Sequence, residues 1–460
     1  MPKCPIYFGV ILALAMVCVV PVLSQPVQSA TGATLIEQEF DDLSVSLQNP
    51  YIHSRFNIED GIKQVSLNFF KETYLTPLPA TGEVQDSHPF FHSLRLFTQH
   101  PKDGLDEVRL HSAAMSESIS ADDSQTIRLE AQSSNGLVLH ATLSINAVQS
   151  IQYVTTTLVN RGESTIELFP AEVLRMNAEA GRSGSPNLLC HAHVPVGPAI
   201  QATDDIELDI GSATPQLKLF PEKSVLEVIY QNQKMDFWFK RSDDWFSIKP
   251  RRAGPALGME WHFPEEGLAS LEENTRVFTT YRPLNQRNWQ TQPHLLGAWY
   301  VHGKLLLEPG ESYTYRQIWN ASVLPSPVID VDNGVTYFSK VNAMAYQNAF
   351  YFFGSMGSPA DGRAAVEFYS RDGELITTEP LSVYNPFMKS GLRNEVTMQL
   401  PVYLTSSVTF GFSEGDLNPE NRASYMWERA SRIRVIVRDE DGNFLKALGE
   451  DREPWQRFRR

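Results

Sequence analysis

His191 and His193 are the most closely spaced pair of histidines in the sequence. Residues two apart on a strand point to the same face of a sheet, so both imidazoles can hold a metal ion or flank a ligand. A metal ion would need a third ligand, for which Glu172, Glu179 and Asp204 are candidates that no motif selects. The alternative is a pair of histidines on a polar face or in a loop, and on that interpretation we predict no metal ion.

The stretch from residue 236 to 262 is dense in aromatic side chains next to charged ones. Indole rings stack on sugar rings, and neighbouring Arg, Asp or His side chains hydrogen-bond to hydroxyl groups, so this stretch favours a carbohydrate cleft. The predicted ligand-binding residues are His191, His193, Trp238, Trp245, Arg252, Trp261 and His262. The alternative is that these aromatic residues pack in a core, in which case Trp238 faces away from Phe237 and Phe239.

Other motifs with a known chemistry are missing or incomplete. Residues 330–334, Asp-Val-Asp-Asn-Gly, begin like a calcium loop, but the glycine comes one residue early and no correctly spaced glutamate follows, so we predict a turn. The sequence contains no Walker loop, dinucleotide fingerprint or Gly-x-Ser-x-Gly motif. We therefore predict no cofactor and assign no catalytic residue.

The first 24 residues have the composition of an export signal. Lys3 gives a positive start, residues 6–23 are almost unbroken apolar, and Pro21 interrupts the run near a cleavage point that follows Ser24. We predict a signal peptide over residues 1–24 and a periplasmic or extracellular location. The alternative is an uncleaved anchor, and only then is the membrane a partner.

Charge and cysteine content restrict the partners and the source of stability. A formal net charge of −15 argues against nucleic acid and weakens attraction to anionic lipid or acidic polysaccharide. Cys4 and Cys18 lie in the export segment, which leaves Cys190 alone and excludes an intramolecular disulfide in the mature chain. Because no disulfide can form, the exported chain must be stabilised by burial of apolar surface, for which its 42% hydrophobic content suffices.

The hydrophobic pattern repeats every two residues over most of the chain. Apolar residues at alternate positions from Leu137 to Ile145 predict a half-buried strand, and the β-branched stretch 151–159 predicts another. Further strands are predicted at residues 127–131, 165–169, 225–230, 235–239, 277–281 and 313–319. Strands separated by polar or glycine-containing turns, without helical segments between them, indicate an all-β fold with a large antiparallel β-sandwich.

A linker at residues 324–327, Leu-Pro-Ser-Pro, divides the chain. We predict a sandwich domain over residues 31–324 and a smaller β-rich sandwich domain over residues 328–460. Asp372-Gly373 and Asp441-Gly442 indicate hairpins in the second domain. One short helix is predicted there, with Asn418 as its N-cap and Pro419 in its first turn.

Residues 154–169 form a strand that is rich in Thr and Val, a polar turn that begins at Asn160, and a second apolar strand. This pattern resembles galactose mutarotase-like supersandwich domains. Residues 56–67 and 307–312 are similar to segments of one member of that superfamily, the periplasmic domain of bacterial membrane-protein insertases. The resemblance implies a fold whose usual uses are carbohydrate or polypeptide binding.

Mutarotases need a carboxylate and histidines on opposite sides of the sugar ring oxygen. His88-Pro89-Phe90-Phe91 looks like the family's His-Pro-Tyr-Phe motif, but it precedes the Thr-rich strand, whereas the family places the motif after it. In the later position the chain has residues 169–172, Phe-Pro-Ala-Glu, without a histidine. We therefore interpret the match as accidental and do not predict mutarotation.

Three functions follow from these patterns. The first is an exported, non-catalytic carbohydrate-binding protein that uses a concave face of the large sandwich. The second is a protein-interaction or chaperone-like module of the cell envelope, with an envelope protein as its partner. The third is a sugar-active enzyme, epimerase or lyase-like, that depends on His191 or His193.

Overall fold

The structure is a computed structural model that describes residues 37–452 with gaps, the longest of which are 76–90, 179–189, 196–205, 264–275, 284–293, 382–400 and 414–429. The described residues form 31 β-strands and contain no helix. The predicted all-β class is confirmed. The predicted signal peptide and the predicted helix after Asn418 fall outside the described residues. Within the described part, no helix is long and apolar enough to cross a membrane.

Local sequence pattern explains the strands that carry most of the core. In strand β9 (Leu137–Asn146) the alternate residues from Leu137 to Ile145 are buried, and His140, Thr142 and Ser144 are partly exposed. Strand β10 (Ile151–Asn160) is rich in Thr, Val and Ile, which suit a pleated surface, and it pairs with β9 in antiparallel register. Both predicted strands are confirmed.

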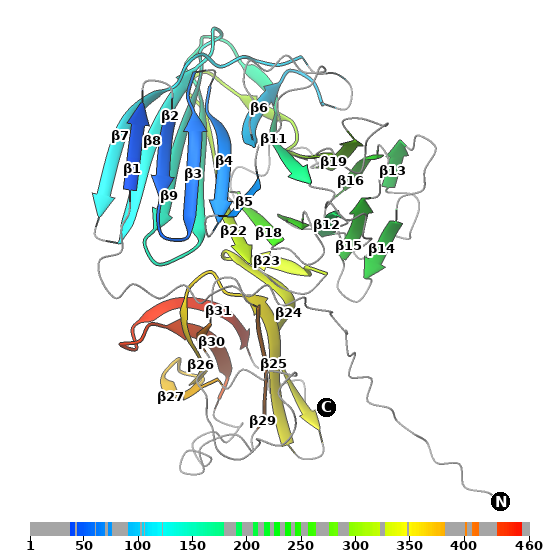
Figure 1. Cartoon of the computed structure of the whole chain (residues 1–460). Coiled ribbons are helices and arrows are strands. Elements are labelled where there is room, and N and C mark those ends of the chain that lie inside the picture. Colours follow the sequence, from blue (N-terminus) through cyan, green and yellow to red (C-terminus); the bar gives the residue numbers. More distant parts are fainter. Residues whose placement is uncertain are drawn as a thin grey trace, which may run out of the picture. The chain divides into compact units, whose positions relative to one another are not determined.

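The first large sheet has twelve strands, ten of which follow the order β1-β2-β3-β4-β6-β11-β20-β19-β16-β13 (Figure 1). Along that order the strands are β1 (Glu37–Asp41), β2 (Ser44–Gln48), β3 (Ile52–Asn57), β4 (Lys63–Phe69), β6 (His92–Phe97), β11 (Ile166–Ala178), β20 (His294–Val301), β19 (Arg276–Pro283), β16 (Met235–Lys240) and β13 (Ile206–Asp209). Strand β5 (Glu72–Leu75) pairs with β4, and β21 (Leu305–Leu307) pairs with β11. We refer to this as the twelve-stranded sheet.

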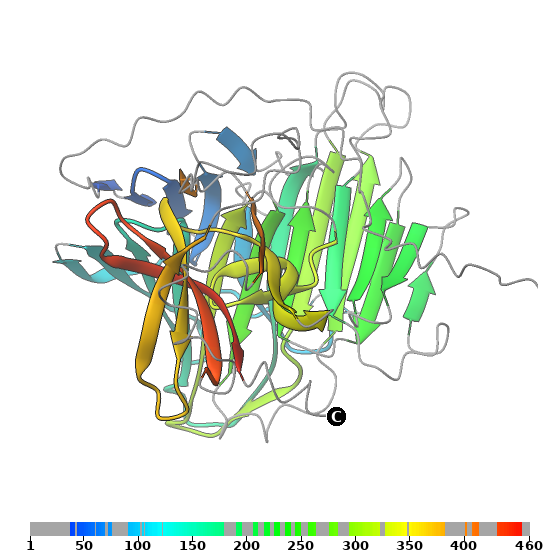
Figure 2. The same ribbon diagram turned by 90° about the horizontal axis from the view of Figure 1, so that it is seen from below.

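The second large sheet has ten strands in the order β14-β15-β12-β17-β18-β22-β10-β9-β8-β7. Besides β9 and β10 these are β14 (Gln216–Phe220), β15 (Val225–Tyr230), β12 (Cys190–Pro195), β17 (Trp245–Lys249), β18 (Ala256–His262), β22 (Ser312–Ser322), β8 (Ser124–Gln132) and β7 (Ala114–Ala121). Figure 2 shows the green strands of the large sheets running side by side.

The two large sheets bury one shared hydrophobic core. From the twelve-stranded sheet it includes Leu67 and Leu174, and from the ten-stranded sheet Leu143, Met259 and Trp319. Successive side chains of a strand point to opposite faces of the sheet. On the ten-stranded sheet, the residues next to these core residues therefore point to its other face, which we call the outer face. That outer face carries the polar side chains discussed below.

The remaining described strands form two smaller sheets. The four-stranded sheet has the order β23-β24-β25-β29, with β23 (Asp330–Asp332), β24 (Val335–Tyr346), β25 (Ala349–Gly357) and β29 (Ser407–Ser413). The five-stranded sheet has the order β27-β26-β30-β31, with β27 (Leu375–Pro380), β26 (Gly362–Tyr369), β30 (Arg432–Arg438), β31 (Phe444–Arg452), and β28 (Pro401–Val402) paired to β26. A second core, which includes Val341, Val366 and Val435, lies between them. The predicted boundary at residues 324–328 stays a prediction.

Three tight turns have the predicted conformation. Asn333 and Gly334, between β23 and β24, have φ angles of 51° and 72°, so the calcium-like sequence is a hairpin turn as predicted. Gly373 and Gly442 have φ angles of 82° and 86° in the two Asp-Gly turns. Positive φ favours glycine because it has no Cβ.

The turn at Gly334 also lies against the outer face of the ten-stranded sheet. Its N–H donates to Glu260 Oε2 at 3.1 Å, and a Cβ at this position would lie 2.7 Å from Ile151 Cδ1 and 3.2 Å from Ile318 Cγ2. Gly258 on β18 has the same property, since its Cβ would lie 2.5 Å from Thr336 Cγ2. Glycine at both positions allows the β23–β24 hairpin to pack closely on the sheet.

We expect Gly334→Ala to lower the free energy of unfolding by about 2–4 kcal/mol, because it adds both a strained φ and a clash in a packed contact. Gly442→Ala is the matched control. Its φ is also positive, but its Cβ would meet nothing within 4 Å, so it should cost only about 1 kcal/mol. Urea unfolding of both variants measures the difference. Equal losses would show that the close contact at Gly334 does not contribute.

Candidate functional site

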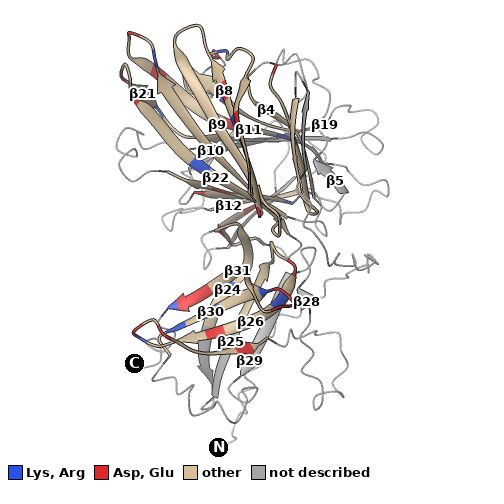
Figure 3. Cartoon of the chain, turned by 90° about the vertical axis from the view of Figure 1, so that its left-hand side faces the viewer, with Lys and Arg blue, Asp and Glu red and all other residues tan. Residues whose placement is uncertain are grey.

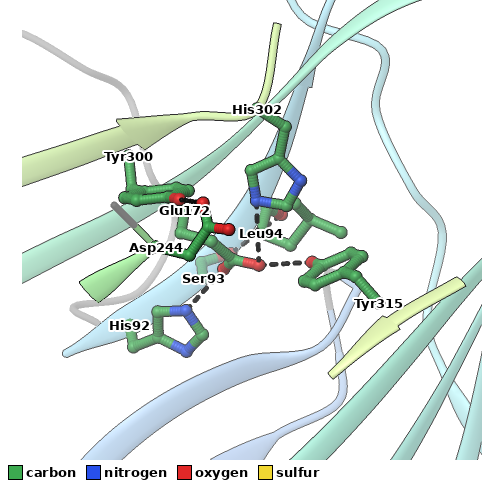
Figure 4. Close-up of polar contacts among 8 residues, drawn as sticks. All are labelled: His92, Ser93, Leu94, Glu172, Asp244, Tyr300, His302 and Tyr315. Atoms are coloured by element: carbon green, nitrogen blue, oxygen red, sulfur yellow. Dashed lines mark hydrogen bonds and ion pairs between the residues drawn. The ribbon is translucent and has the colours of Figure 1, made fainter. Parts of the chain in front are cut away.

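Glu172 is a buried carboxylate that both large sheets contact. Strand β11 pairs with β6, and this pairing brings His92 Nε2 to 2.5 Å from Glu172 Oε2. Tyr315, on β22 of the opposite sheet, donates a hydrogen bond from its hydroxyl to Glu172 Oε1 (Figure 4). His302, which directly follows β20 of the same sheet as Glu172, has its Nε2 3.9 Å from the same oxygen. We call Glu172, His92, His302 and Tyr315 the Glu172 centre. It links the two layers of the sandwich through a single side chain.

The Glu172 centre holds an ionised carboxylate next to a protonated phenol. Burial raises the pKa of Glu172, but the neighbouring His92 and His302 and the hydrogen bonds from His92 and Tyr315 outweigh it, so the pKa lies below its ordinary value. Burial and the Glu172 carboxylate raise the pKa of Tyr315 well above its ordinary value. A carboxylate, imidazoles and a phenol are groups that can perform general acid–base chemistry.

A small cavity lies beside the Glu172 centre, between the two large sheets. Its volume is about 30 Å³, and its polar lining consists of Gln64, His92, Thr156, Glu172 and Gln317. One water molecule needs about 10–15 Å³ of such volume, so the cavity has room for about two waters and not for a sugar ring. Both amide atoms of Gln317 lack a hydrogen-bonding partner among the described residues, which is consistent with a hydrated cavity.

His191, His193 and Glu227 form a second histidine–carboxylate cluster, on the outer face of the ten-stranded sheet. Strand β12 lies between β15 and β17, and the register places His193 opposite Glu227 on one side and Ser247 on the other. His191 Nδ1 lies 2.7 Å from Glu227 Oε1, and His193 Nε2 lies 3.2 Å from the same oxygen. We call these three residues the Glu227 cluster. They are buried, with exposed fractions of 5%, 0% and 4%.

Burial and mutual contacts fix the charges in the Glu227 cluster. Burial is the largest influence on His193 and, with Lys249 and His191, lowers its pKa to about 4 despite the opposing effect of Glu227. Burial raises the pKa of Glu227, but the hydrogen bonds with His191 and His193 outweigh it, so the pKa lies below its ordinary value. At neutral pH the cluster therefore contains an ionised Glu227 and a neutral His193.

The predicted pairing of His191 with His193 on one face is what the structure shows. The two rings are stacked, with centroids 6.4 Å apart and planes 20° apart. The carboxylate that joins them is Glu227, whereas sequence reasoning considered Glu172, Glu179 and Asp204. Glu172 belongs to the other sheet, and Glu179 and Asp204 lie outside the described residues.

The predicted aromatic cleft does not form from Trp245 and Trp261. Trp245 is 3% exposed and packs with Val328 and Val331 in a small hydrophobic cluster. Trp261 is 2% exposed, belongs to the main core and stacks on Tyr300 with ring centroids 3.7 Å apart. Neither indole face is open to a ligand, and both residues follow the alternative of core packing.

Of the other predicted residues in this stretch, the structure describes the side chain of His262 but not those of Trp238 and Arg252. Strand β16 contains Trp238, but its side chain lies outside the described part of the structure, as does all of Arg252. The side chain of His262 is 45% exposed and pairs with the carboxylate of Glu260. Glu260 raises the pKa of His262. Of the predicted residues that the structure describes, His262 is the one accessible to a ligand.

His262 begins a row of exposed or partly exposed side chains across the outer face of the ten-stranded sheet. Register aligns one residue from each of six neighbouring strands, β18, β22, β10, β9, β8 and β7: His262, Arg316, Thr155, Thr142, Arg128 and Glu117. At a strand spacing of about 4.8 Å this row is roughly 24 Å long. We call it the polar row. Figure 3 shows strands β8, β9, β10 and β22 side by side, with most of their length uncharged.

One aromatic ring lies next to the polar row. Tyr153 on β10 is partly exposed, and the guanidinium carbon of Arg316 lies 4.5 Å from its ring centroid. Thr157 and Thr314, one step further along the same strands, share a hydrogen bond of 2.9 Å between their hydroxyls. The face therefore offers hydroxyl, guanidinium and imidazole groups beside an aromatic ring.

Sequence reasoning missed His92, His302, Tyr315 and Glu227. His92 directly follows the His-Pro-Phe-Phe segment that was interpreted as an accidental match, and Glu172 ends the Phe-Pro-Ala-Glu segment. The pairing of β6 with β11 brings these two residues together. For His92 and Glu172, the sequence signal that could have identified them is therefore their position next to or within these motif segments. No such signal marked Glu227, which sits among the apolar residues of β15.

A comparison with solved structures finds proteins to which this chain is similar at low sequence identity. A galactose mutarotase-like protein from Clostridium acetobutylicum matches with 9% identity over 63% of this chain and 99% of its own, at a TM-score of 0.41. A proposed aldose 1-epimerase from Klebsiella pneumoniae matches with 9% identity over 62% of this chain and 83% of its own, at 0.41. Another from Escherichia coli matches with 13% identity over 64% of this chain and 100% of its own, at 0.39.

No protein-family model matches the sequence, and no curated protein matches it.

We expect Glu172→Gln to lower the free energy of unfolding at pH 7 by about 3–5 kcal/mol, because it removes the charge that His92, His302 and Tyr315 surround. The folded-state pKa of Glu172 is lowered, so its contribution is present above the unfolded value of about 4.3 and is lost as pH falls through the folded value. The gap between wild type and variant should therefore narrow below about pH 4.

Urea unfolding of both proteins between pH 3 and pH 8 measures this gap, since the other carboxyl groups contribute equally to both. Glu308→Gln, an exposed carboxylate in a turn, is the control and should change stability by less than about 0.5 kcal/mol. A gap that does not change with pH would contradict the stabilising role of the Glu172 charge.

Proposed function

We propose that this chain is an exported protein that binds a neutral carbohydrate on the outer face of the ten-stranded sheet. The observation that carries the proposal is the polar row, which aligns six side chains that can hydrogen-bond to hydroxyl groups. Tyr153 adds a ring on which a sugar can stack.

The charges of the chain and of the row favour a neutral ligand. The protein carries a net charge of −15, which opposes binding of a polyanion. Within the row, the guanidinium of Arg128 pairs with Glu117, so part of its charge is already compensated. Threonine hydroxyls at the centre of the row both donate and accept hydrogen bonds, which suits the hydroxyl groups of a sugar.

The positions of the two histidine–carboxylate groups support binding rather than turnover. Glu172 lies between the sheets beside a cavity of about 30 Å³, which is too small for a sugar. Glu227 is 4% exposed and lies on β15, five strands from β10 in the sheet order. Neither carboxylate reaches a ligand that follows the polar row between β22 and β8.

Export is part of the proposal and rests on the sequence. The apolar residues 6–23 after Lys3 have the composition of a cleaved signal peptide. An exported location also agrees with a mature chain that has one cysteine and relies on buried apolar surface. N-terminal sequencing of the protein secreted by its host tests whether cleavage follows Ser24.

We expect the full mature chain to bind neutral oligosaccharides on a glycan array, and Tyr153→Ala and Arg316→Ala to weaken that binding at least tenfold. The reason is the loss of the stacking surface in the first variant and of a hydroxyl-binding guanidinium in the second. Titration calorimetry with the strongest ligand from the array gives the affinities.

The matched controls are Tyr369→Ala and Arg432→Ala. These residues form the same kind of pair on β26 and β30, with the guanidinium carbon 4.0 Å from the ring centroid. The controls should bind with wild-type affinity. An array without any bound neutral glycan would refute the proposal, as would equal losses in the controls and in the variants of the polar row.

A further inference from the structure

We propose that the Glu227 cluster is a binding site for a divalent first-row transition metal ion, with Zn²⁺ as the ion that suits it best. His191, His193 and Glu227 each offer one ligand atom, and these atoms all lie within 4.8 Å of one another. Two imidazole nitrogens and one carboxylate oxygen, with a fourth position open, are a ligand set that proteins use for zinc. The sequence alone predicted no metal ion.

The geometry of the sheet brings the ligand atoms together. Residues 191 and 193 share a face of β12 because they are two apart, and Glu227 enters the same face because it is the cross-strand partner of His193. Both imidazoles turn a nitrogen toward the same carboxylate oxygen, at 2.7 and 3.2 Å. A metal ion would replace these direct contacts with three metal–ligand bonds from the same atoms.

The cluster is buried, so its ligand atoms are shielded from bulk water. His193 has no exposed surface and Glu227 is 4% exposed, and in such surroundings the attraction between a carboxylate and a bound cation is stronger than in water. Nε2 of His191 has no hydrogen-bonding partner among the described residues, whereas Nδ1 of the same ring contacts Glu227. Coordination at Nδ1 would fix the orientation of the ring.

Lys249 is the group that opposes a metal ion. It lies on β17 as the cross-strand partner of His191, is 1% exposed, and its charge acts on His193. Its ammonium group repels a cation and attracts the same carboxylate. The site should therefore bind zinc less tightly than an isolated set of the same ligands, and removal of this charge should raise the affinity.

The test uses the full mature chain, expressed in medium with added zinc because buried ligands exchange metal slowly. Mass spectrometry of the metal content should find about one zinc ion per chain, and His193→Ala and Glu227→Gln should each lower this at least tenfold. Replacement by Co²⁺ should give visible absorption bands typical of tetrahedral coordination by nitrogen and oxygen. Circular dichroism checks that each variant is folded.

His140→Ala is the matched control, since His140 also faces a glutamate on the same sheet, with Nδ1 3.4 Å from Glu130 Oε2, but forms no three-residue ligand group with other described residues. It should retain all of its zinc, and so should Cys190→Ser.

Lys249→Met should bind Zn²⁺ at least tenfold more tightly than wild type. This variant tests the site while leaving all three proposed metal ligands in place.

The proposal is overturned if wild type and Lys249→Met both bind no Zn²⁺ or Co²⁺ beyond the level of the Glu227→Gln variant. It is also overturned if His140→Ala loses as much zinc as His193→Ala. Glycan binding is measured separately on the same preparations. The two proposals therefore fail independently, because Tyr153 and Arg316 are not ligands of the metal.

Discussion

The strict alternation of side chains across the ten-stranded sheet is the constraint on which the other features depend. One face of each strand enters the core shared with the twelve-stranded sheet, so every second residue must occupy the outer face. On β12 this sends Ala192 into the core and leaves His191 and His193 outside it. On β10 it sends Val154 and Leu158 inward and leaves Tyr153 and Thr155 on the outer face.

The outer face of this sheet is divided into three zones with different chemistry. The Glu227 cluster occupies β12 and β15, where it is buried. The central zone, on β17, β18 and β22, is covered by residues 328–336, and glycines at positions 258 and 334 permit the close approach. The third zone is the exposed part of the polar row from β22 to β7. The proposed ion site, the internal contact and the proposed ligand-binding surface thus lie on one sheet without sharing residues.

The two buried glutamates show how a β-sandwich stabilises an internal charge. Each is ionised because histidines surround it, and each pKa lies below the ordinary value although burial alone would raise it. They differ in what lies beside them. Glu172 adjoins a cavity for about two waters and accepts a hydrogen bond from a hydroxyl of the opposite sheet, which suits a structural charge. Glu227 contacts two imidazoles that can act with it as ligands, which is the basis of the proposed cation site, and the nearby Lys249 opposes that use.

The sequence by itself determined the strands, their inward faces and the turns, because these depend on a period of two and on the conformational freedom of glycine within a few residues. It also placed His191 and His193 on one face. Only the tertiary structure decided that Glu227, 34 residues from His193, joins them, and that His92 meets Glu172 across 80 residues. It also decided that Trp245 and Trp261 are buried. The local sequence pattern determines to which face of the sheet a side chain points. Which residues that side chain contacts depends on the pairing of distant strands and on the segments that pack on that face.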